Sequence, residues 1–495
     1  MNTSLNGARR AQDLAAVANG EVVDVLVIGG GVTGAGVALD AASRGLSVCL
    51  LEAHDLAFGT SRWSSKLVHG GLRYLAQGEV GLAHESAVER GILMTRTAPH
   101  LVRALPQLVP LYDSRGAVVM AGLRAGDALR RAARTPSAVL PRPRRVPAAE
   151  ALALVPGLRR NGLRGNGLRG GLLGFDGQLV DDARLVLALA RTAAGLGARI
   201  ITKARVTAVT GHGASAVDGV TGNAFEVRAR SVVNAAGVWA GQLVDSVSLR
   251  PSRGSHLVLD AAKAGVTGTA LTVPVPGERN RYALVLPQQD GRLYVGLTDE
   301  LVSGPVPDVP EVPQSDVDFL LRVARTVLDV GPDDVLGSFA GLRPLLAGTG
   351  ARGADLSRKH AVLRSPDGVL TVVGGKLTTY RRMAADAVSA AVEQRGLTAG
   401  PCRTANLPLV GAGTVPPGLP SRLVARYGTE AAEIAALDMP EKVSGEITAA
   451  EVVWAVRHEA ALDASDVLER RTRISLVPAD VAAAEPLVQA LLTGA

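Results

Sequence analysis

The chain has 495 residues, of which 47% are hydrophobic and 20% charged, and this balance excludes a disordered chain. Its only two cysteines, Cys49 and Cys402, exclude a disulfide scaffold and argue against a cysteine-based zinc or iron–sulfur centre. The net charge of +7 is consistent with binding to an anionic ligand, nucleic acid or an anionic membrane surface, or with an arginine-rich genome. The aromatic content of 3% argues against a surface on which nucleic-acid bases stack.

The length predicts three or four domain-sized units, at roughly 150 residues each. No apolar run approaches the roughly 18 residues that a membrane span needs. Residues 1–19 lack the apolar core of a secretory signal. We therefore expect a protein in the cytoplasm or at the inner face of a membrane, with residues 1–20 as a mobile tail.

The first elements form a strand–turn–helix–strand unit. A strand is predicted at Val22–Ile28, a helix at Gly34–Arg44 and a second strand at Leu46–Leu51. A helix that connects two strands in this way predicts a parallel sheet.

The turn of this unit has the G-x-G-x-x-G spacing of a dinucleotide-binding loop and spans Gly29 to Gly34. Gly29 allows the tight turn, Gly31 lets the backbone approach a pyrophosphate, and Gly34 lets the helix pack against the strand. Val32 and Thr33 lie at the helix N-terminus, which faces the phosphate charge.

Glu52 ends the second strand, 18 residues after Gly34. A carboxylate at this place accepts the ribose hydroxyls of an adenosine group. The unit alone leaves FAD and NAD open, because both carry ADP.

Further elements follow along the chain. Strands are predicted at 198–201, 231–233, 282–286, 293–297 and 369–373, and helices at 183–196, 316–330 and 377–395. Residues 116–146 hold seven arginines and one aspartate, and form either a solvated insertion or a basic amphipathic patch that touches anionic lipid. Glycine and proline cluster at 400–420, which predicts a boundary, and residues 421–495 are expected to be all-helical.

The segment after Glu52 resembles the signature of the FAD-dependent glycerol-3-phosphate dehydrogenases. Residues 64–75 read SSKLVHGGLRYL, which differs from the family's usual SSKLIHGGLRYL only at Val68. The other matching motifs are Val180–Leu185, Gly254–His256, Gly341–Leu345, Gly374–Arg381 and Arg470–Arg473. The resemblance covers about residues 21 to 475.

This resemblance implies an α/β fold of the D-amino-acid-oxidase type. An FAD-binding, doubly wound (Rossmann-like) domain would comprise residues 21–104, 170–250 and 335–398. A mixed-sheet substrate-binding cap would comprise 105–169 and 251–334, and a helical domain would comprise 399–495.

Residues that would hold FAD are assigned on the matched motifs. Thr60, Ser61, Ser64, Ser65 and Lys66 suit hydrogen bonds to the edge of the flavin ring. A helix N-terminus at Gly375, Lys376, Leu377 and Thr378 would stabilise the negative charge of reduced flavin. The remaining cofactor candidates are His69, Gly70, Gly71, Val206 and Gly237.

Phosphate recognition and proton removal are the tasks of the substrate site. The candidate phosphate ligands are Arg73, Arg343 and Arg358, because a guanidinium suits phosphate oxygens. His256 is our choice of catalytic base for the substrate hydroxyl, with His69 as the second choice. The remaining substrate-binding candidates are Tyr74 and Lys376. Lys376, counted with His256 and Arg343 as catalytic, orients the substrate oxygen or stabilises the flavin, and both roles stay open.

No metal site is expected, since Asp181 and Asp182 are interpreted as the acidic start of a helix. The resemblance implies oxidation of sn-glycerol 3-phosphate to dihydroxyacetone phosphate, with electrons passed to a membrane quinone by an enzyme at the inner face of the cytoplasmic membrane. The alternatives are an oxidase that uses oxygen, an amine or amino-acid oxidase, and a flavoprotein that binds nucleic acid, which the low aromatic content disfavours. The C-terminal helices would cover the FAD domain or mediate homodimerisation.

Overall fold

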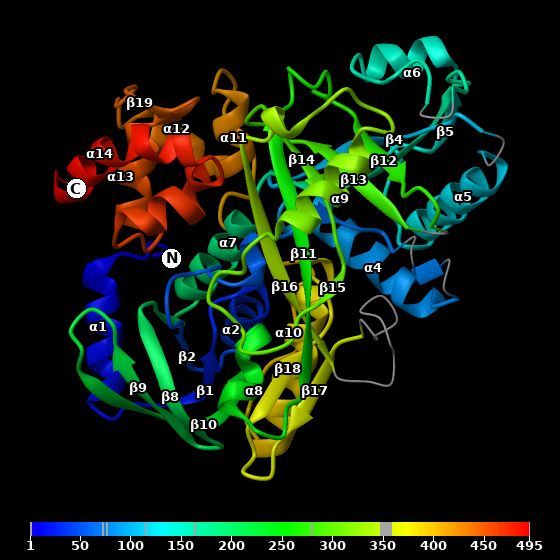
Figure 1. The fold of residues 1–495 in the computed structure, drawn as a ribbon. Helices are drawn as coiled ribbons and strands as arrows, with labels where there is room; N and C mark the ends of the chain where they lie inside the picture. The colour runs from blue at the N-terminus through cyan, green and yellow to red at the C-terminus, as the bar shows by residue number, and fades with distance from the viewer. Residues whose placement is uncertain are drawn as a thin grey trace.

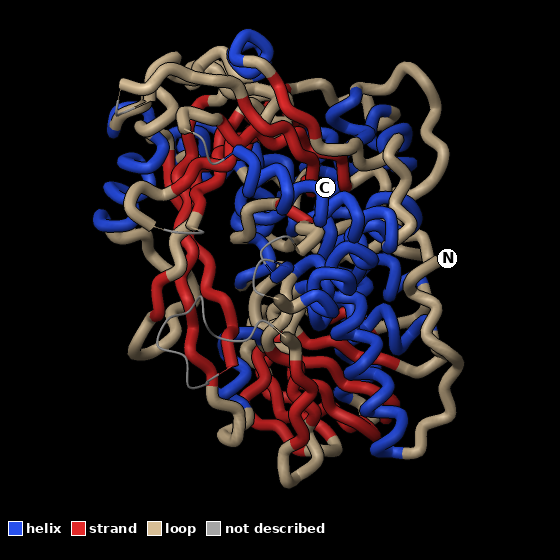
Figure 2. The backbone as a smooth tube through the Cα atoms, turned by 90° about the vertical axis from the view of Figure 1, so that its right-hand side faces the viewer, coloured by secondary structure: helices blue, strands red, loops and turns tan. Residues whose placement is uncertain are grey.

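A computed structural model describes residues 2–71, 74–75, 78–113, 116–162, 165–278, 281–346 and 359–494. The described residues form two large sheets, the helices beside them and a C-terminal group of helices (Figure 1). Figure 2 shows the two sheets as separate groups of strands, with helices beside and between them. The predicted division into a doubly wound part, a mixed-sheet part and a C-terminal helical part is confirmed.

The first sheet carries the predicted strand–turn–helix–strand unit. Its strand order is β17-β18-β10-β1-β2-β7, and all neighbours except β17 and β18 run parallel. These strands span Ala361–Arg364, Leu370–Val373, Ala224–Asn234, Val22–Ile28, Val48–Leu51 and Arg199–Ile201. An antiparallel hairpin, β8 (Ala204–Thr210) and β9 (Gly213–Asp218), continues from β10.

Alternate residues of the central strands enter two different cores, as the two-residue period of a strand requires. Val25 and Val27 of β1 join the core under helices α2 (Val32–Ser43), α7 (Asp182–Gly195) and α10 (Tyr380–Arg395). Leu26 and Ile28 face the other core, which contains Cys49 and is covered by the β8–β9 hairpin. The sheet is therefore buried on both faces, which is usual for parallel sheets.

The second sheet is mixed, as predicted. Its order is β15-β11-β14-β13-β12-β4-β6-β3, with β16 paired to β11 and β5 paired to β6. Within this second sheet, β12 and β4 form the only parallel pair among the described residues, and the other pairs are antiparallel. In sheet order the strands span Glu300–Leu301, Leu249–Asp260, Arg292–Gly296, Tyr282–Pro287, Ala270–Pro274, Val102–Pro110, Gly171–Leu179 and Leu67–Val68, with β16 at Gly337–Leu346 and β5 at Arg144–Val146.

Three strands of the second sheet lie entirely within residues that were assigned to the FAD-binding domain. They are β3, β6 and β16, which fall within 21–104, 170–250 and 335–398. Helix α9 (Gln314–Ala324), which packs on the second sheet, ends six residues before the predicted end at 330. Arg325 is the C-cap of the helix, and its Nε donates to the carbonyl of Val330 at 2.9 Å.

The N-terminal segment is ordered rather than a mobile tail. Helix α1 spans Gly7–Ala18, with Asn6 accepting the capping hydrogen bond from the N–H of Arg9. Arg10 is nearly buried and pairs with Asp218 at the end of β9. Leu5 is buried and bridges to Glu459. The expectation missed these contacts because the partners lie about two hundred or more residues away in the sequence.

The basic segment 116–146 begins with helix α5 (Gly116–Ala132), which follows β4 and a short loop. Val119, Met120 and Leu123 pack against the second sheet, so one face of α5 is buried. Of the seven arginines in the segment, only Arg130 is buried, and it pairs with Asp127.

The C-terminal domain is mainly helical, with one exception. Its helices are α11 (Ser421–Tyr427), α12 (Ala431–Ala435), α13 (Ala449–His458) and α14 (Pro478–Gly494), with short helical turns η7 (Gly428–Glu430), η8 (Asp466–Arg471) and η9 (Ile474–Leu476). The expectation of an all-helical domain was wrong for β19 (Lys442–Ser444) and β20 (Ile447–Thr448), which form a hairpin. Gly445 takes φ +54° in its tight turn, a conformation that favours glycine.

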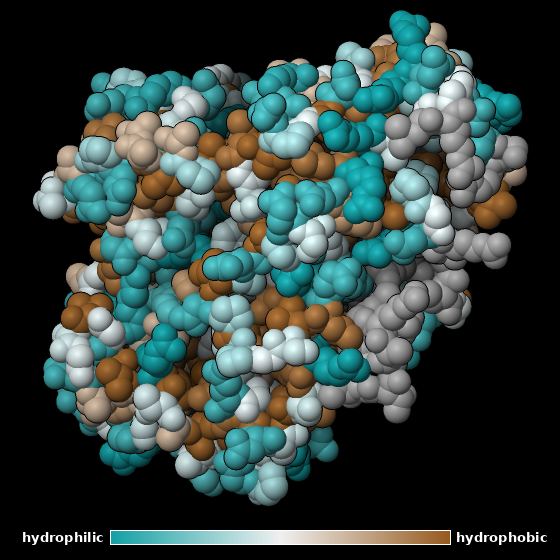
Figure 3. All heavy atoms as spheres, in the orientation of Figure 1, coloured by the Kyte–Doolittle hydropathy of each residue, from teal (hydrophilic) through white to brown (hydrophobic). Residues whose placement is uncertain are grey.

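None of the helices in the described ranges is long and apolar enough to cross a bilayer. On the face drawn in Figure 3, apolar patches are separated by polar side chains.

Candidate active site

The glycine turn between β1 and α2 leaves no room for a Cβ at three of its positions. At Gly30 a Cβ would lie 2.9 Å from the Cβ of Glu52, and the other two positions are Gly29 and Gly34. Gly29 takes φ +105°, and a Cβ there would lie 2.6 Å from the carbonyl oxygen of Ala235. A Cβ on Gly34 would lie 1.8 Å from the carbonyl oxygen of Gly29. At Gly31 the nearest atom is Ser61 Oγ, 3.1 Å away. Gly31 is thus the open position of the turn, as approach of a pyrophosphate requires.

Glu52 lies directly behind this turn. One carboxylate oxygen accepts the N–H of Gly30 at 2.5 Å, and the other accepts the N–H of His54 at 2.8 Å. Burial raises the pKa of Glu52. The N–H of Val32 at the start of α2 donates to Ser61 Oγ at 2.8 Å.

Several FAD candidates meet at the carboxyl ends of the parallel strands. Gly29 follows β1, Glu52 follows β2, and Gly237, with φ +58°, follows β10. Val206 lies half-buried on β8, two residues after Ala204, whose N–H donates to the carbonyl of Glu52 at 2.8 Å. Ligands of doubly wound sheets bind at this edge, so the residues fit the ADP part of FAD.

Residues 60–66 connect the cofactor side with the second sheet. Thr60 Oγ1 donates to the carbonyl of Leu342 on β16 at 2.5 Å, and the N–H of Ser64 donates to Asp182 at 2.9 Å. Ser65 Oγ lies 2.8 Å from His256 Nε2. The predicted hydroxyl groups therefore lie together, and Ser65 contacts the predicted base.

Lys66 lies in the interior instead of presenting its ammonium group at the surface of a site. Its Nζ is 2.8 Å from Asp182 Oδ1 and 2.7 Å from the carbonyl oxygen of Arg62, and the residue is 2% exposed. Burial lowers the pKa of Lys66 to about 8. Asp181 caps the start of α7 by accepting the N–H of Ala183, and Asp182 is the first residue of the helix, where its carboxylate pairs with Lys66.

His256 has the environment of a neutral imidazole. It is 2% exposed on β11 and stacks on Phe339, with 4.7 Å between ring centroids. Burial lowers its pKa well below the usual value, and three positive charges lower it further: Lys66, Arg343 and Arg473. Its Nδ1 is buried and has no hydrogen-bond partner among the described residues, so this nitrogen is left unsatisfied.

Arg343 lies on β16, which pairs with β11. A Cβ on Gly254 would lie 2.2 Å from Arg343 Nη2, so the guanidinium passes over Gly254 on the face of β11 that carries His256. Arg343 Nη1 lies 3.2 Å from an oxygen of Asp299, and Nη2 donates to the carbonyl of Thr298 at 3.1 Å. Asp299 is therefore a partner that orients Arg343.

The Gly374–Thr378 segment is a tight turn that leads into α10. Gly374 and Gly375 take φ +75° and +68°, and η6 spans Leu377–Thr379. Lys376 Nζ donates to Ser86 Oγ at 2.5 Å and lies 4.1 Å from the ring centroid of Tyr74. Two predicted substrate residues, Tyr74 and Lys376, are therefore in contact. Sequence reasoning missed Ser86, which stands 290 residues from Lys376 with no motif around it.

The His69–Gly71 turn is held by Asp176 of β6. Asp176 accepts the N–H of Gly70 at 3.1 Å, and its carboxylate lies 3.5 Å from His69 Nδ1 and 2.6 Å from Arg90. His69 is half exposed and serves this turn. Arg73 and Arg358, both predicted phosphate ligands, lie outside the described residues.

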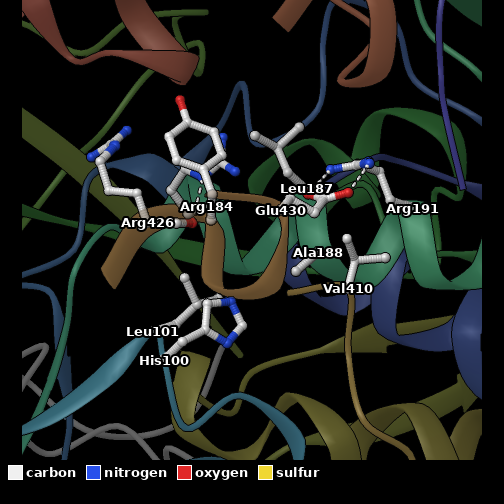
Figure 4. Close-up of a pocket in the computed structure, with 10 residues that line it drawn as sticks. His100, Leu101, Arg184, Leu187, Ala188, Arg191, Val410, Arg426 and Glu430 are labelled. Carbon is white, nitrogen blue, oxygen red and sulfur yellow. Dashed lines mark hydrogen bonds and ion pairs between the residues drawn. The ribbon is translucent and has the colours of Figure 1, made fainter. Parts of the chain in front are cut away.

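Hollows in the described part of the chain include a groove and a small cavity. A groove of about 610 Å³ runs between the start of α4 (Val80–Ile92) and Lys359–His360, on the helix that carries Ser86. A cavity of about 10 Å³ lies between α7 and the C-terminal domain (Figure 4). That cavity has room for about one water molecule and is not the active site.

Comparison with known proteins agrees with this geometry. Residues 24–381 match the FAD-dependent oxidoreductase family, and residues 402–493 match the C-terminal domain of alpha-glycerophosphate oxidase. The chain is 56% identical to glycerol-3-phosphate dehydrogenase 1 of Mycobacterium tuberculosis, over 97% of this chain and 96% of the relative. It is 34% identical to a mitochondrial glycerol-3-phosphate dehydrogenase of Arabidopsis thaliana, over 96% and 83% of the two chains.

Solved structures give the same result. The glycerol-3-phosphate dehydrogenase of Bacillus halodurans complexed with FAD superimposes with a TM-score of 0.74 and 26% identity, over 99% of this chain and 94% of that one. The fold is also shared with L-alpha-glycerophosphate oxidase of Mycoplasma pneumoniae with FAD bound, at a TM-score of 0.58 and 18% identity, over 79% of this chain and 99% of that one. The chain therefore belongs to the FAD-dependent oxidoreductase family, in the group that contains the glycerol-3-phosphate dehydrogenases.

Proposed function

We propose that the protein oxidises sn-glycerol 3-phosphate to dihydroxyacetone phosphate and passes the electrons to a membrane quinone. Bound FAD would supply the acceptor for the hydride of C2, at flavin N5. One observation carries the proposal: a buried, neutral His256 and the Arg343 guanidinium lie on the same face of β11.

His256 takes the proton of the C2 hydroxyl. A neutral imidazole can accept it, and the low pKa of His256 keeps the ring neutral at physiological pH. Ser65 fixes one ring nitrogen and Phe339 fixes the ring plane, so the base is oriented before the substrate binds.

Arg343 binds the phosphate, with Asp299 holding its guanidinium in place. Arg73 and Arg358 would add further charge, as the family resemblance implies. Lys376 and Tyr74, which contact each other near Ser86, would line the same site.

The decisive experiment is an anaerobic visible spectrum of the purified protein before and after adding glycerol 3-phosphate. Bleaching of a flavin spectrum is the expected result. A flavin spectrum that stays unchanged would refute the substrate and favour an amine or amino-acid oxidase.

The electron acceptor needs a separate test. A specific observation favours oxygen as the second candidate, because residues 402–493 match a domain named after an oxidase. Steady-state rates with a soluble quinone analogue and with oxygen alone distinguish the two. We expect fast turnover with the quinone, and rapid turnover with oxygen alone would make the protein an oxidase.

We also propose peripheral attachment to the inner face of the cytoplasmic membrane. The support is the basic segment, whose exposed arginines suit anionic headgroups: Arg124, Arg131, Arg134, Arg142, Arg144 and Arg145. Flotation with vesicles of increasing anionic lipid content should show increasing binding. Binding that ignores lipid charge would refute the electrostatic form of this proposal. Dimerisation through the C-terminal helices stays a prediction.

A further inference from the structure

Three arginines near the C-terminus make buried contacts with the segment that follows β2. They are Arg470, Arg471 and Arg473. Arg470 Nε lies 2.5 Å from Asp55 Oδ2, and the two terminal nitrogens of Arg471 lie 2.6 and 2.8 Å from the two oxygens of Asp55. Asp55 is fully buried and stands three residues after Glu52. One end of this segment is therefore fixed by the C-terminal domain.

Arg473 fixes the other end. Its Nη1 donates to the carbonyl of Arg62 at 2.7 Å and lies 3.0 Å from Asp182 Oδ1. Asp182 in turn pairs with Lys66 and accepts the N–H of Ser64. The side chains of Arg473, Asp182 and Lys66, with the carbonyl of Arg62 and the N–H of Ser64, thus form one buried network around residues 62–66.

Ser65 lies between the two residues that Asp182 holds, and its hydroxyl contacts His256 at 2.8 Å. Lys66 and Arg473 both take left-handed backbone conformations, with φ +57° and +65°. Side-chain-bearing residues keep such conformations only where surrounding contacts over-determine them, often at functional sites. The network therefore specifies the backbone on both sides of Ser65.

We propose that Arg473 of the C-terminal domain is a positioning residue for His256, acting through Asp182, the 62–66 segment and Ser65. This inference rests on the proposed function, in which His256 is the base. It gives the C-terminal domain a part in catalysis, in addition to covering the FAD-binding domain.

The same interface contains an ion pair that serves as a control. Arg191 on α7 makes two hydrogen bonds to Glu430 of the C-terminal domain, at 2.6 and 2.7 Å (Figure 4). The Arg191 side chain is 2% exposed and that of Arg473 is 4% exposed. Arg191→Lys therefore makes the same chemical change as Arg473→Lys in the same interface, but outside the network around residues 62–66.

The test compares Arg473→Lys, Ser65→Ala, the double variant and Arg191→Lys in the FAD-loaded full-length protein. Arg473 Nη1 makes both contacts. A lysine keeps the charge, but its shorter side chain cannot bring the ammonium group to the position of Nη1. We expect Arg473→Lys to lower kcat for glycerol 3-phosphate about tenfold or more, with little change in KM, and to alter the visible circular dichroism of the flavin. Arg191→Lys should keep the parental kcat and spectrum, even where its melting temperature falls.

The double variant tests the route. If Arg473 acts through Ser65, Arg473→Lys with Ser65→Ala should lose no more in kcat than the worse single variant. Multiplied losses, an equal effect of Arg191→Lys, or a parental kcat and flavin spectrum in Arg473→Lys would each overturn the proposal.

A different pattern is expected if the proposed function is wrong. The flavin of the parent protein would then not bleach with glycerol 3-phosphate. The flavin spectra and FAD dissociation constants of the two lysine variants would still show whether Arg473 positions the 62–66 segment. A change confined to Arg473→Lys supports this role, and identical values in both variants refute it.

Discussion

In the proposed reaction, His256 is the residue on which the chemistry depends most directly. Because its pKa lies well below the usual 6.5, the ring should stay unprotonated at pH 6.5, and kcat/KM should fall only as the pH drops well below that value. His256→Gln should lower kcat by about two to four orders of magnitude, the usual range for loss of a general base, while FAD stays bound. Stopped-flow flavin reduction measures this step, and a reduction rate equal to the parent's would remove His256 as the base.

Arg343 should act on binding more than on turnover. A charged hydrogen bond from Arg343 to the substrate phosphate would be worth about 1.5–3 kcal/mol, so Arg343→Ala should raise KM about ten- to a hundredfold or more. Asp299→Asn should have a smaller effect in the same direction, since the guanidinium keeps its bond to the carbonyl of Thr298. Steady-state kinetics with the FAD content checked by absorbance tests both, and an unchanged KM in Arg343→Ala would contradict the assignment.

At the scale of one element, substitutions at two positions of the glycine turn should have different effects, one on flavin binding and one on folding. Gly31→Val should leave a folded protein without flavin, because a branched side chain would fill the open position beside Ser61. Gly34→Ala should instead destabilise the domain itself, since its Cβ would lie 1.8 Å from a backbone oxygen. The ratio of flavin to protein absorbance, together with the melting temperature, distinguishes the two outcomes. Retained flavin in Gly31→Val would show that this position does not face the cofactor.

The His69–Gly71 turn should make stability depend on acid pH. Burial raises the pKa of Asp176, but the Arg90 charge and the His69 contact outweigh burial and lower it to about 2, from 3.8. A lowered carboxyl pKa stabilises the fold above pH 3.8, and this contribution is lost as the pH falls towards 2. It amounts to about 2 kcal/mol at neutral pH.

Asp176→Asn should therefore lower the melting temperature at pH 7, and the difference from the parent should shrink as the pH approaches the lower pKa. Melting curves across that range test the sign. A gap that widens in acid would mean that Asp176 is not ionised in the folded protein.

Over the whole molecule, the sequence predicted what is encoded locally. The unit from Val22 to Glu52 could be predicted, because its hydrophobic period, glycine spacing and motif context lie within a short stretch. The mixed second sheet was expected only from the family resemblance. The ordered α1 and the link from Arg471 to Asp55 could not be predicted, since partners 416 residues apart leave no local signal. The same holds for Lys66: its motif predicts a cofactor contact, but only the folded chain brings it to Asp182.

The C-terminal domain should depend on buried charges for its attachment to the FAD-binding domain. Glu459 is fully buried, and its carboxylate lies 2.7 Å from Arg184 and 3.7 Å from Arg191 of α7. Those charges lower its pKa against the effect of burial. Removing one partner of such a pair leaves the other buried and uncompensated, at a cost of about 3–5 kcal/mol.

Glu459→Gln should accordingly lower the melting temperature clearly and expose the region around residues 400–420 to proteases. The matched control is Glu446→Gln, which removes the exposed pair with Lys442 and should leave the melting temperature unchanged. Limited proteolysis followed by mass spectrometry locates the first cuts. If Glu459→Gln melts and is cleaved like Glu446→Gln, packing of apolar side chains, and not the buried charges, holds the two domains together.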